Sequence, residues 1–397
     1  MSETRNIVVL GASFGGLGAA HYIARHVLPK LAQAKGAKYV LHLLDPSTHF
    51  WWHIGAPREL VSVKEMPHSK YFLPIVDAFK QYPQLKDSIV FHHGTATDVN
   101  LEGRTITFTP HESSATETLP YYALVIATGV KSPTPITTLH GDHHISIKAL
   151  EEMNSKLVNA KEVIIGGGGP VAVETAGEIG AHSKGKARIT LVAGGKKLLP
   201  VLNESRSKQV QKLLEKVGVT VLYETKVTGT SETSDGKTEV QLSNGKTMTA
   251  DVYIPAVGVQ PNTQFLPKSI LKAGSGWVNA NPLTLRVDSA GPLVYAVGDV
   301  ANADKGGALL MQASLPVFGA NFAHDVLKNA GVGSVPAERS YKRNDGETQL
   351  VPVGPKLGVG AFNGWSMPGF AVSMFKGKDY MAAQIDKTYL GGIVAKA

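Results

Sequence analysis

Two segments of the chain share one order of features: an apolar strand, a glycine-rich turn and then a helical stretch. The first runs from Asn6–Leu10 into Gly11–Gly16, and the second from Glu162–Ile165 into Gly166–Ala172. Such a turn lets backbone N–H groups and the positive end of the helix dipole meet a pyrophosphate, and glycine permits the close approach. The two copies lie too far apart for a solenoid repeat. The sequence therefore predicts two related nucleotide-binding units in one chain.

The first turn differs from the usual three-glycine pattern, because Ser13 stands at the middle position. Serine is small, and its hydroxyl can itself donate to a phosphate. The next predicted strand, Tyr39–Asp45, ends in an acid that is placed for the ribose hydroxyls of adenosine. A tight strand-to-helix turn without a ligand is the alternative interpretation. The nucleotide-binding interpretation selects Gly11, Ser13, Phe14, Gly15, Gly16 and Asp45.

The second turn has the order Gly167-x-Gly169-x-x-Ala172. Glu174 follows in the first turn of the predicted helix, close to the positive end of its dipole and to the expected cofactor pocket. Glu178 lies one turn further along the same face. We predict a catalytic role for Glu174, with a surface acid that only complements the helix dipole as the alternative.

The residues after the next predicted strand, Arg188–Val192, bear on the choice of coenzyme. NAD-selective sites place an Asp or Glu at the end of this strand for the ribose hydroxyls. Here the acid is missing, and Lys196 and Lys197 follow two glycines. A 2′-phosphate would meet positive charge there. We therefore predict that NADPH is accepted, with NADH as the other candidate; a solvated turn is the alternative for the two lysines.

A third signal lies in the segment Tyr295–Asp299, where an acid directly follows a buried strand and a glycine. Such an aspartate can accept a hydrogen bond from a ribityl hydroxyl of a flavin, although alone it could cap a helix. Two further glycine turns accompany it, Ala127–Gly129 and Val257–Gly258. Together these signals select Thr128, Gly129, Gly258, Gly298 and Asp299 as cofactor-binding candidates.

These motifs together resemble those of the flavoproteins with two dinucleotide-binding domains, and the resemblance covers nearly the whole chain. Within that superfamily the chain is most similar to the apoptosis-inducing-factor-like branch, closest to its ferroptosis-suppressor group, through Phe50–Arg58 and the tail from Gly358 to Lys387. The resemblance implies an α/β fold with two Rossmann-like domains and a small C-terminal α+β segment. We expect the FAD-binding domain to span 1–145 and 266–328, the NAD(P)H-binding domain 146–265 and the C-terminal domain 329–397.

The same resemblance implies roles for individual residues. FAD would contact Arg58, which pairs with the pyrophosphate, and Ala96, which holds adenine through its backbone. Glu174 would lie on the nicotinamide side, and Lys387 would stand near the flavin as a second catalytic residue. FAD contacts are also implied for Gly11, Gly15, Gly16 and Asp299.

The chain contains no cysteine, which constrains where electrons can go. Disulfide reductases place a cysteine pair beside the flavin, so that route is closed here. The reduced flavin must therefore meet its acceptor directly, and the family resemblance favours a quinone, near Met311, Gln312 and Phe318; helix core is the alternative for these three. Two other functions stay open: reduction of a protein acceptor such as a ferredoxin, and a low-turnover flavoprotein that binds nucleic acid or membrane.

Charge and termini bear on partners and location. The formal net charge of +8 suits anionic partners and is also a common aid to solubility. Ser2 follows Met1, whereas myristoylation needs a glycine there, so we expect no such anchor. We expect a cytoplasmic protein with peripheral membrane contact as an option, and we expect no metal despite the cluster His140, Asp142, His143 and His144.

Overall fold

The first unit of the structure is built on a seven-stranded sheet with the order β18-β8-β1-β2-β5-β6-β7. The computed structural model describes residues 3–34 and 36–396, so Ser2, on which the expectation about myristoylation depends, lies outside the described residues. The first five strands in that order are parallel, and β6 and β7 extend β5 as an antiparallel arm. The strands are β1 (Glu3–Leu10), β2 (Ala37–Asp45), β5 (Ile89–Asn100), β6 (Thr105–Pro110), β7 (Glu117–Pro120), β8 (Ala123–Ile126) and β18 (Val294–Ala296).

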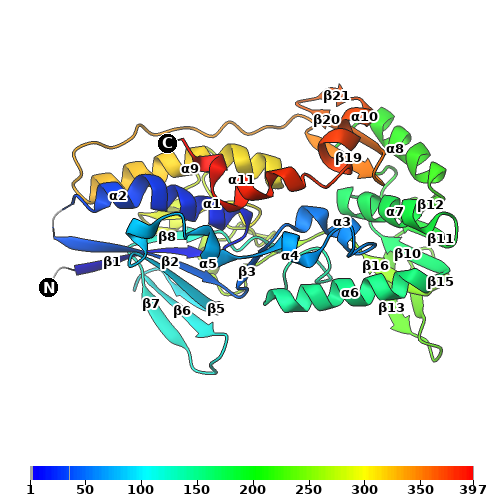
Figure 1. Cartoon of the computed structure of the whole chain (residues 1–397), viewed down its shortest axis with the longest axis horizontal. Helices are drawn as coiled ribbons and strands as arrows, with labels where there is room; N and C mark the ends of the chain where they lie inside the picture. Colours follow the sequence, from blue (N-terminus) through cyan, green and yellow to red (C-terminus); the bar gives the residue numbers. More distant parts are fainter. Residues whose placement is uncertain (1–2, 35, 397) are drawn as a thin grey trace.

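Helices cover one face of this sheet, as Figure 1 shows for α1 (Phe14–Tyr22), α2 (Leu28–Leu31) and α9 (Ala308–Asn329). The sequence predicted that Pro316 would interrupt the last of these, but α9 is continuous with Pro316 inside it. Its inner face is fully buried, including Phe318 and Phe322. Tertiary packing of this kind outweighs the single backbone hydrogen bond that a proline removes.

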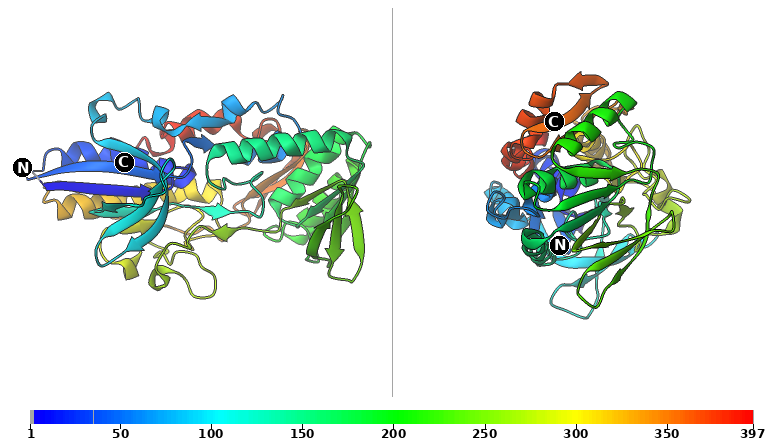
Figure 2. Two further views of the ribbon diagram at one scale, coloured as in Figure 1. Left: turned by 90° about the horizontal axis from the view of Figure 1, so that it is seen from below. Right: turned by 90° about the vertical axis from the view of Figure 1, so that its right-hand side faces the viewer.

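The second unit has a four-stranded parallel sheet with the order β12-β11-β10-β16, beside a three-stranded antiparallel sheet, β13-β14-β15. It lies next to the first unit along the long axis of the molecule (Figure 2). Its strands are β10 (Glu162–Gly166), β11 (Arg188–Val192), β12 (Val219–Leu222), β13 (Val227–Glu232), β14 (Thr238–Leu242), β15 (Thr247–Ala250) and β16 (Val252–Pro255). Its helices are α6 (His143–Asn159), α7 (Pro170–Ser183) and α8 (Glu204–Lys216).

The chain crosses between the two units twice. The outgoing connection forms β9 (Val130–Lys131), and the returning one forms β17 (Gln260–Pro261), which pairs with it antiparallel. The second unit is thus inserted into the first, whose sheet is completed only by β18. The prediction of two Rossmann-like units is confirmed, while the numbered domain boundaries stay predictions.

The C-terminal segment forms the predicted hairpin, β19 (Gln349–Val353) and β20 (Leu357–Phe362), followed by β21 (Trp365–Met367). The apolar run Phe370–Phe375 resembles a strand in sequence, and that prediction is wrong. The run is helical, in α10 (Gly369–Val372) and the π-helix η6 (Ser373–Gly377). A buried helix face explains it, because Val372 packs where Gly358 and Gly360 leave no side chain. The last α-helix, α11 (Ile385–Tyr389), lies beside α1 (Figure 1), and a short 3-10 helix, η8 (Gly392–Val394), follows it.

Candidate functional site

The first glycine turn forms a narrow cradle between β1 and α1. A Cβ on Gly11, whose φ is +93°, would overlap the carbonyl oxygen of Ala127, and one on Gly16 would overlap that of Gly11. Ser13 is the N-cap of α1, yet its side chain makes no capping hydrogen bond. The hydroxyl and the first N–H groups of α1 therefore suit a phosphate group.

Gly298 and Asp299 face this turn from the end of β18. A Cβ on Gly15 would lie 3.4 Å from Cα of Gly298, so the two backbones approach closely. The Asp299 carboxylate accepts a hydrogen bond of 2.7 Å from the N–H of Gly307. Burial raises the pKa of Asp299, because it disfavours the ionised carboxylate. A hydroxyl that donates to this carboxylate would stabilise its ionised form. A small cavity borders Asp299 together with Met311 and Ser314. The glycine cradle and the half-buried acid thus suit the phosphate and ribityl groups of FAD.

Asp45, at the end of β2, holds the turn in place. Its Oδ2 accepts the N–H of Ala12 at 2.6 Å, and its Oδ1 accepts that of Ser47 at 2.7 Å. Burial raises its pKa to about 6, against these two hydrogen bonds. The predicted ribose acid therefore also fastens the turn to β2, a role that the sequence did not show. Each oxygen keeps a second lone pair for a ribose hydroxyl.

The turn Thr128–Gly129 joins the two connections between the units. The Thr128 hydroxyl donates to the carbonyl of Asn262 at 2.8 Å, and the Asn262 amide donates back to the carbonyl of Thr128 at 2.9 Å. Asn262 was not identified from the sequence, because only the fold brings it to this turn. Gly129 and Gly258 have φ of +61° and +109°, which explains the glycines.

Ala96 lies on β5 opposite Phe108 of β6, beyond the stretch Ile89–His93 where β5 pairs with β2. At Ala96 the strand β5 no longer pairs with β2, which is compatible with the predicted contact of the Ala96 backbone to adenine. The contact itself stays a prediction.

The second glycine turn repeats the geometry of the first. A Cβ on Gly167 would overlap the carbonyl oxygen of Ala256, whereas one on Gly169 would meet no atom within 4 Å. Gly169 is the N-cap of α7, so the helix start is open to a ligand. Of the two lysines predicted to bind a 2′-phosphate, Lys196 is exposed, but Lys197 donates to the carbonyl of Leu202.

Glu174 is buried in α7 and forms an ion pair with a lysine that the sequence did not indicate. Nζ of Lys376, in η6, lies 2.6 Å from its Oε1 and also donates to the carbonyl of Leu350 at 3.2 Å. Burial raises the pKa of Glu174, and Lys376 opposes this rise. Lys387 lies exposed on α11, and its implied position beside the flavin stays a prediction. Lys376 lies eleven residues before it in the same tail, directly after the run Phe370–Phe375.

Arg58, in α3 (Ala56–Glu59), does not face the first glycine turn with its donors. Its Nε and one terminal nitrogen bind the Glu178 carboxylate at 3.1 and 2.8 Å. The remaining donors reach the carbonyls of Gly377 and Lys378 at 2.6 and 2.7 Å. The Tyr380 hydroxyl donates to the same carboxylate at 3.0 Å. Arg58 thus ties α3 to α7 and to the tail, while its implied pairing with a pyrophosphate stays a prediction.

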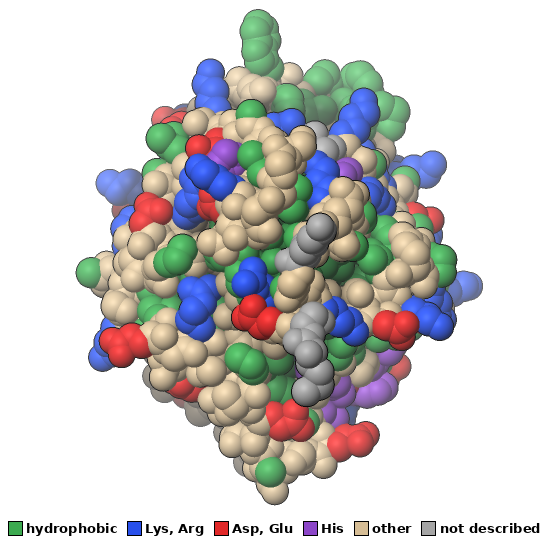
Figure 3. All heavy atoms as spheres, turned by 90° about the vertical axis from the view of Figure 1, so that its left-hand side faces the viewer, with side chains coloured by type: hydrophobic (Ala, Val, Ile, Leu, Met, Phe, Trp, Pro, Cys, Tyr) green, Lys and Arg blue, Asp and Glu red, His purple; other side chains and the backbone are tan. Residues whose placement is uncertain are grey.

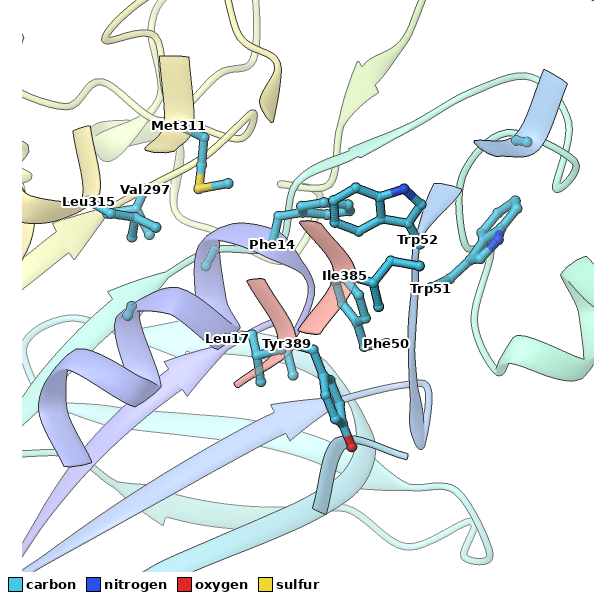
Figure 4. Packing of buried hydrophobic residues seen from close by; sticks show 14 of the residues in the cluster. Phe14, Leu17, Phe50, Trp51, Trp52, Val297, Met311, Leu315, Ile385 and Tyr389 are labelled. Carbon is cyan, nitrogen blue, oxygen red and sulfur yellow. The ribbon is translucent and has the colours of Figure 1, made fainter. Parts of the chain in front are cut away.

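An aromatic cluster lies beside the first turn (Figure 4). The Phe14 ring contacts the rings of Phe50, Trp52 and His53 at centroid distances of 5.0, 5.2 and 5.0 Å. The Trp52 indole donates to the carbonyl of Tyr380 at 2.9 Å, which joins the cluster to the tail. The segment His49–His53 therefore packs against the first turn and the tail, as its run of aromatic residues suggests.

The predicted acceptor pocket near α9 is only partly open. Phe318 packs into the core against Tyr295 and Phe322, at ring-centroid distances of 5.6 and 5.4 Å, so it cannot line a pocket. Met311 borders the cavity at Asp299, and Gln312 is half-buried.

The histidine cluster has a structural explanation. Asp142 is the N-cap of α6 and accepts the N–H of His144 at 3.0 Å. One ligand atom from each of Asp142, His143 and His144 falls within 4.8 Å of the others. The positive end of α6 disfavours a cation at this place.

Comparisons with known proteins agree with this geometry. The family model of the pyridine nucleotide-disulphide oxidoreductases matches residues 5–316. Oxidoreductase phnG of Penicillium herquei is 37% identical, over 96% of this chain and 94% of that protein. Ferroptosis suppressor protein 1 of Homo sapiens is 25% identical, over 98% and 96%. The solved sulfide:quinone oxidoreductase of Aquifex aeolicus has a TM-score of 0.73 at 15% identity, over 99% of this chain and 93% of that one.

Proposed function

The chain belongs to the pyridine nucleotide-disulphide oxidoreductase family and is an FAD-dependent NAD(P)H oxidoreductase, and we propose that it reduces a quinone directly from the flavin. One observation carries the proposal. A carboxylate–ammonium pair, buried Glu174 with half-buried Lys376, lies one turn into α7, beyond the first helical turn where the sequence predicted Glu174, in a chain that has no cysteine. The chain therefore has a proton-holding pair and lacks the two thiols that a disulfide reductase needs.

Bound FAD supplies the hydride acceptance and electron transfer that side chains cannot perform. The first glycine turn, Asp299 and Asp45 would hold it, and the second turn would hold the pyrophosphate of NAD(P)H. Glu174 and Lys376 would share a proton beside the nicotinamide, because burial favours the neutral form of Glu174 while the ammonium opposes it. The cluster of Phe14, Phe50 and Trp52 would exclude water from the first turn.

Support for a quinone comes from chemistry and from one neighbour. A quinone takes two electrons and two protons, so a proton-holding pair suits its reduction. The solved structure with the same fold is named a sulfide:quinone oxidoreductase. A protein acceptor such as a ferredoxin is the competing function.

Anaerobic stopped-flow absorbance of the purified flavoprotein tests the proposal. We expect NADPH to bleach the flavin and a short-chain quinone to restore its colour within the mixing experiment. A flavin that neither NADPH nor NADH bleaches would contradict the assignment. Recolouring that is fast with a ferredoxin and slow with every quinone would favour the protein acceptor.

We also propose that the tail contacts an anionic membrane surface, from which a lipid-soluble quinone would be drawn. Five large apolar side chains form the tail face: Phe362, Trp365, Phe370, Met374 and Phe375. Trp365 and Phe370 are 81% and 74% exposed. Hydrophobic side chains gather at the top of the molecule in Figure 3, the edge that carries β21 and α10 in Figure 1.

Charge around the tail face supports a lipid partner. The stretch 349–378 contains no Asp or Glu, while exposed Lys356 and Lys378 lie within it; its third lysine, Lys376, is paired with Glu174. Aromatic and basic side chains together are typical of surfaces that bind anionic lipid. Among the described residues, no helix is both long and apolar enough to cross a bilayer.

Flotation with vesicles tests this contact. We expect the protein to float with phosphatidylcholine vesicles that contain phosphatidylglycerol, and the double variant Trp365→Ser/Phe370→Ser to lose most of the bound fraction. Val158→Ser is the matched control, since Val158 is 73% exposed on α6, away from the tail face. Equal flotation of all three proteins would refute the tail face as the contact.

A further inference from the structure

A lysine that the sequence analysis did not select reaches the turn after β11. Lys226 directly precedes β13, yet two backbone hydrogen bonds lay its segment along this turn. The N–H of Thr225 donates to the carbonyl of Ala193, and that of Glu224 to the carbonyl of Gly195, both at 3.2 Å. The segment 224–226 therefore runs beside residues 193–195.

The side chain of Lys226 lies across Gly194. A Cβ on Gly194 would stand 2.9 Å from Cγ of Lys226 and 3.3 Å from its Cε. The ammonium is one bond beyond Cε, so it stays close to this glycine, and Lys226 as a whole is exposed. Gly194 is not among the residues with positive φ, so the missing side chain, rather than an unusual backbone, makes the room.

The turn that Lys226 covers is next to the second glycine turn. A Cβ on Gly168 would lie 3.3 Å from Cβ of Ala193, and the N–H of Leu199 donates to the carbonyl of Gly168 at 2.8 Å. In a Rossmann-like unit the adenosine ribose of the coenzyme lies at the end of this strand, beside the glycine turn. Lys226 and Lys196 therefore border the place where a 2′-phosphate would be.

We propose that Lys226 and Lys196, rather than Lys196 and Lys197, recognise the 2′-phosphate of NADPH. The inference rests on the proposed function, because it needs NAD(P)H at the second glycine turn. Lys197 is less available, since its ammonium donates to the carbonyl of Leu202. Glu224 is the opposing group: it is exposed at the same turn and could instead accept the ribose hydroxyls of NADH.

Calorimetric titration of the flavin-loaded protein with adenosine 2′,5′-bisphosphate, and with 5′-ADP as the ligand lacking the 2′-phosphate, tests the proposal. We expect Lys226→Met to weaken binding of the bisphosphate about tenfold, the loss of one charge-assisted hydrogen bond, and to leave 5′-ADP unchanged. Lys197→Met is the matched control and should leave both ligands unchanged.

Gly194→Ala gives a second variant that keeps every charge. The added Cβ would displace the aliphatic part of the Lys226 side chain. We therefore expect Gly194→Ala, like Lys226→Met, to weaken binding of the bisphosphate and to leave binding of 5′-ADP unchanged. An unchanged bisphosphate affinity in Lys226→Met would overturn the proposal, and so would equal weakening of both ligands. If Glu224→Gln bound 5′-ADP more weakly while Lys226→Met bound the bisphosphate normally, the proposal would be overturned and NADH would be the favoured coenzyme. These titrations do not involve electron transfer, so they fail independently of the quinone reductase assignment.

Discussion

Replacing Lys376 by methionine is expected to slow reduction of the bound flavin by NADPH about 100-fold, because Glu174 would lose the ammonium that fixes it beside the nicotinamide, and misplaced positioning groups cost about this much in rate. The methionine keeps an unbranched apolar side chain of similar length, so packing around η6 should persist. Glu174 would lose the ammonium that opposes the rise in its pKa. Stopped-flow absorbance at several pH values measures the effect, and the visible spectrum reports whether the flavin is retained.

Lys387→Met is the matched control for this variant, because Lys387 is a lysine of the same tail that lies exposed on α11. We expect it to behave like the unmodified protein. Glu174→Gln should reproduce the slow reduction, and the double variant should be no slower than either single one, because the pair acts as a unit. If the flavin were reduced normally in Lys376→Met and slowly in Lys387→Met, the result would support the catalytic role that the family resemblance implies for Lys387.

Replacing Arg58 by methionine is expected to lower the free energy of unfolding by about 3 to 5 kcal/mol. The substitution would leave Glu178 buried with the Tyr380 hydroxyl at 3.0 Å and His182 as its remaining neighbours. It would also remove the donors to the carbonyls of Gly377 and Lys378, where the tail meets α3. Denaturant titration of the protein with and without flavin measures the loss.

Two variants separate this interpretation from the one that places Arg58 at the pyrophosphate. Arg188→Met removes an exposed ion pair with Glu162 and should leave stability unchanged. Arg58→Met/Glu178→Met should recover part of the stability, since no buried charge is left alone. Loss of flavin from Arg58→Met with unchanged stability of the flavin-free protein would instead support the pyrophosphate contact.

The glycine turns show how much of the fold could be predicted from the sequence. An apolar strand, a turn that excludes side chains and a helix are all local features, and local sequence specifies them. The same holds for the hairpin of β19 and β20 and for the acid at the end of β2. The helical form of Phe370–Phe375 could not be predicted in this way, because it depends on Gly358 and Gly360 from another strand.

The residues of the candidate site likewise fall into those that local sequence indicated and those that only the fold brings to the site. Glu174 and Asp299 were found because each stands at a fixed step from a glycine turn. Lys376, Asn262 and Lys226 were missed, since each reaches the site from a segment distant in sequence. For Arg58 the sequence did not indicate the ion pair with Glu178, because it shows the position of a cation and not the carboxylate that folding brings to it.

By itself, the sequence determined two nucleotide-binding units, and the absence of cysteine closed the route through a thiol pair within this chain. These conclusions depend on turn geometry and on which side chains exist, both of which are local properties. Only the tertiary structure decided which lysine neutralises Glu174 and which carboxylate holds Arg58. Ion pairs between distant segments form where folding buries two charges together, because a buried charge without a partner costs several kcal/mol.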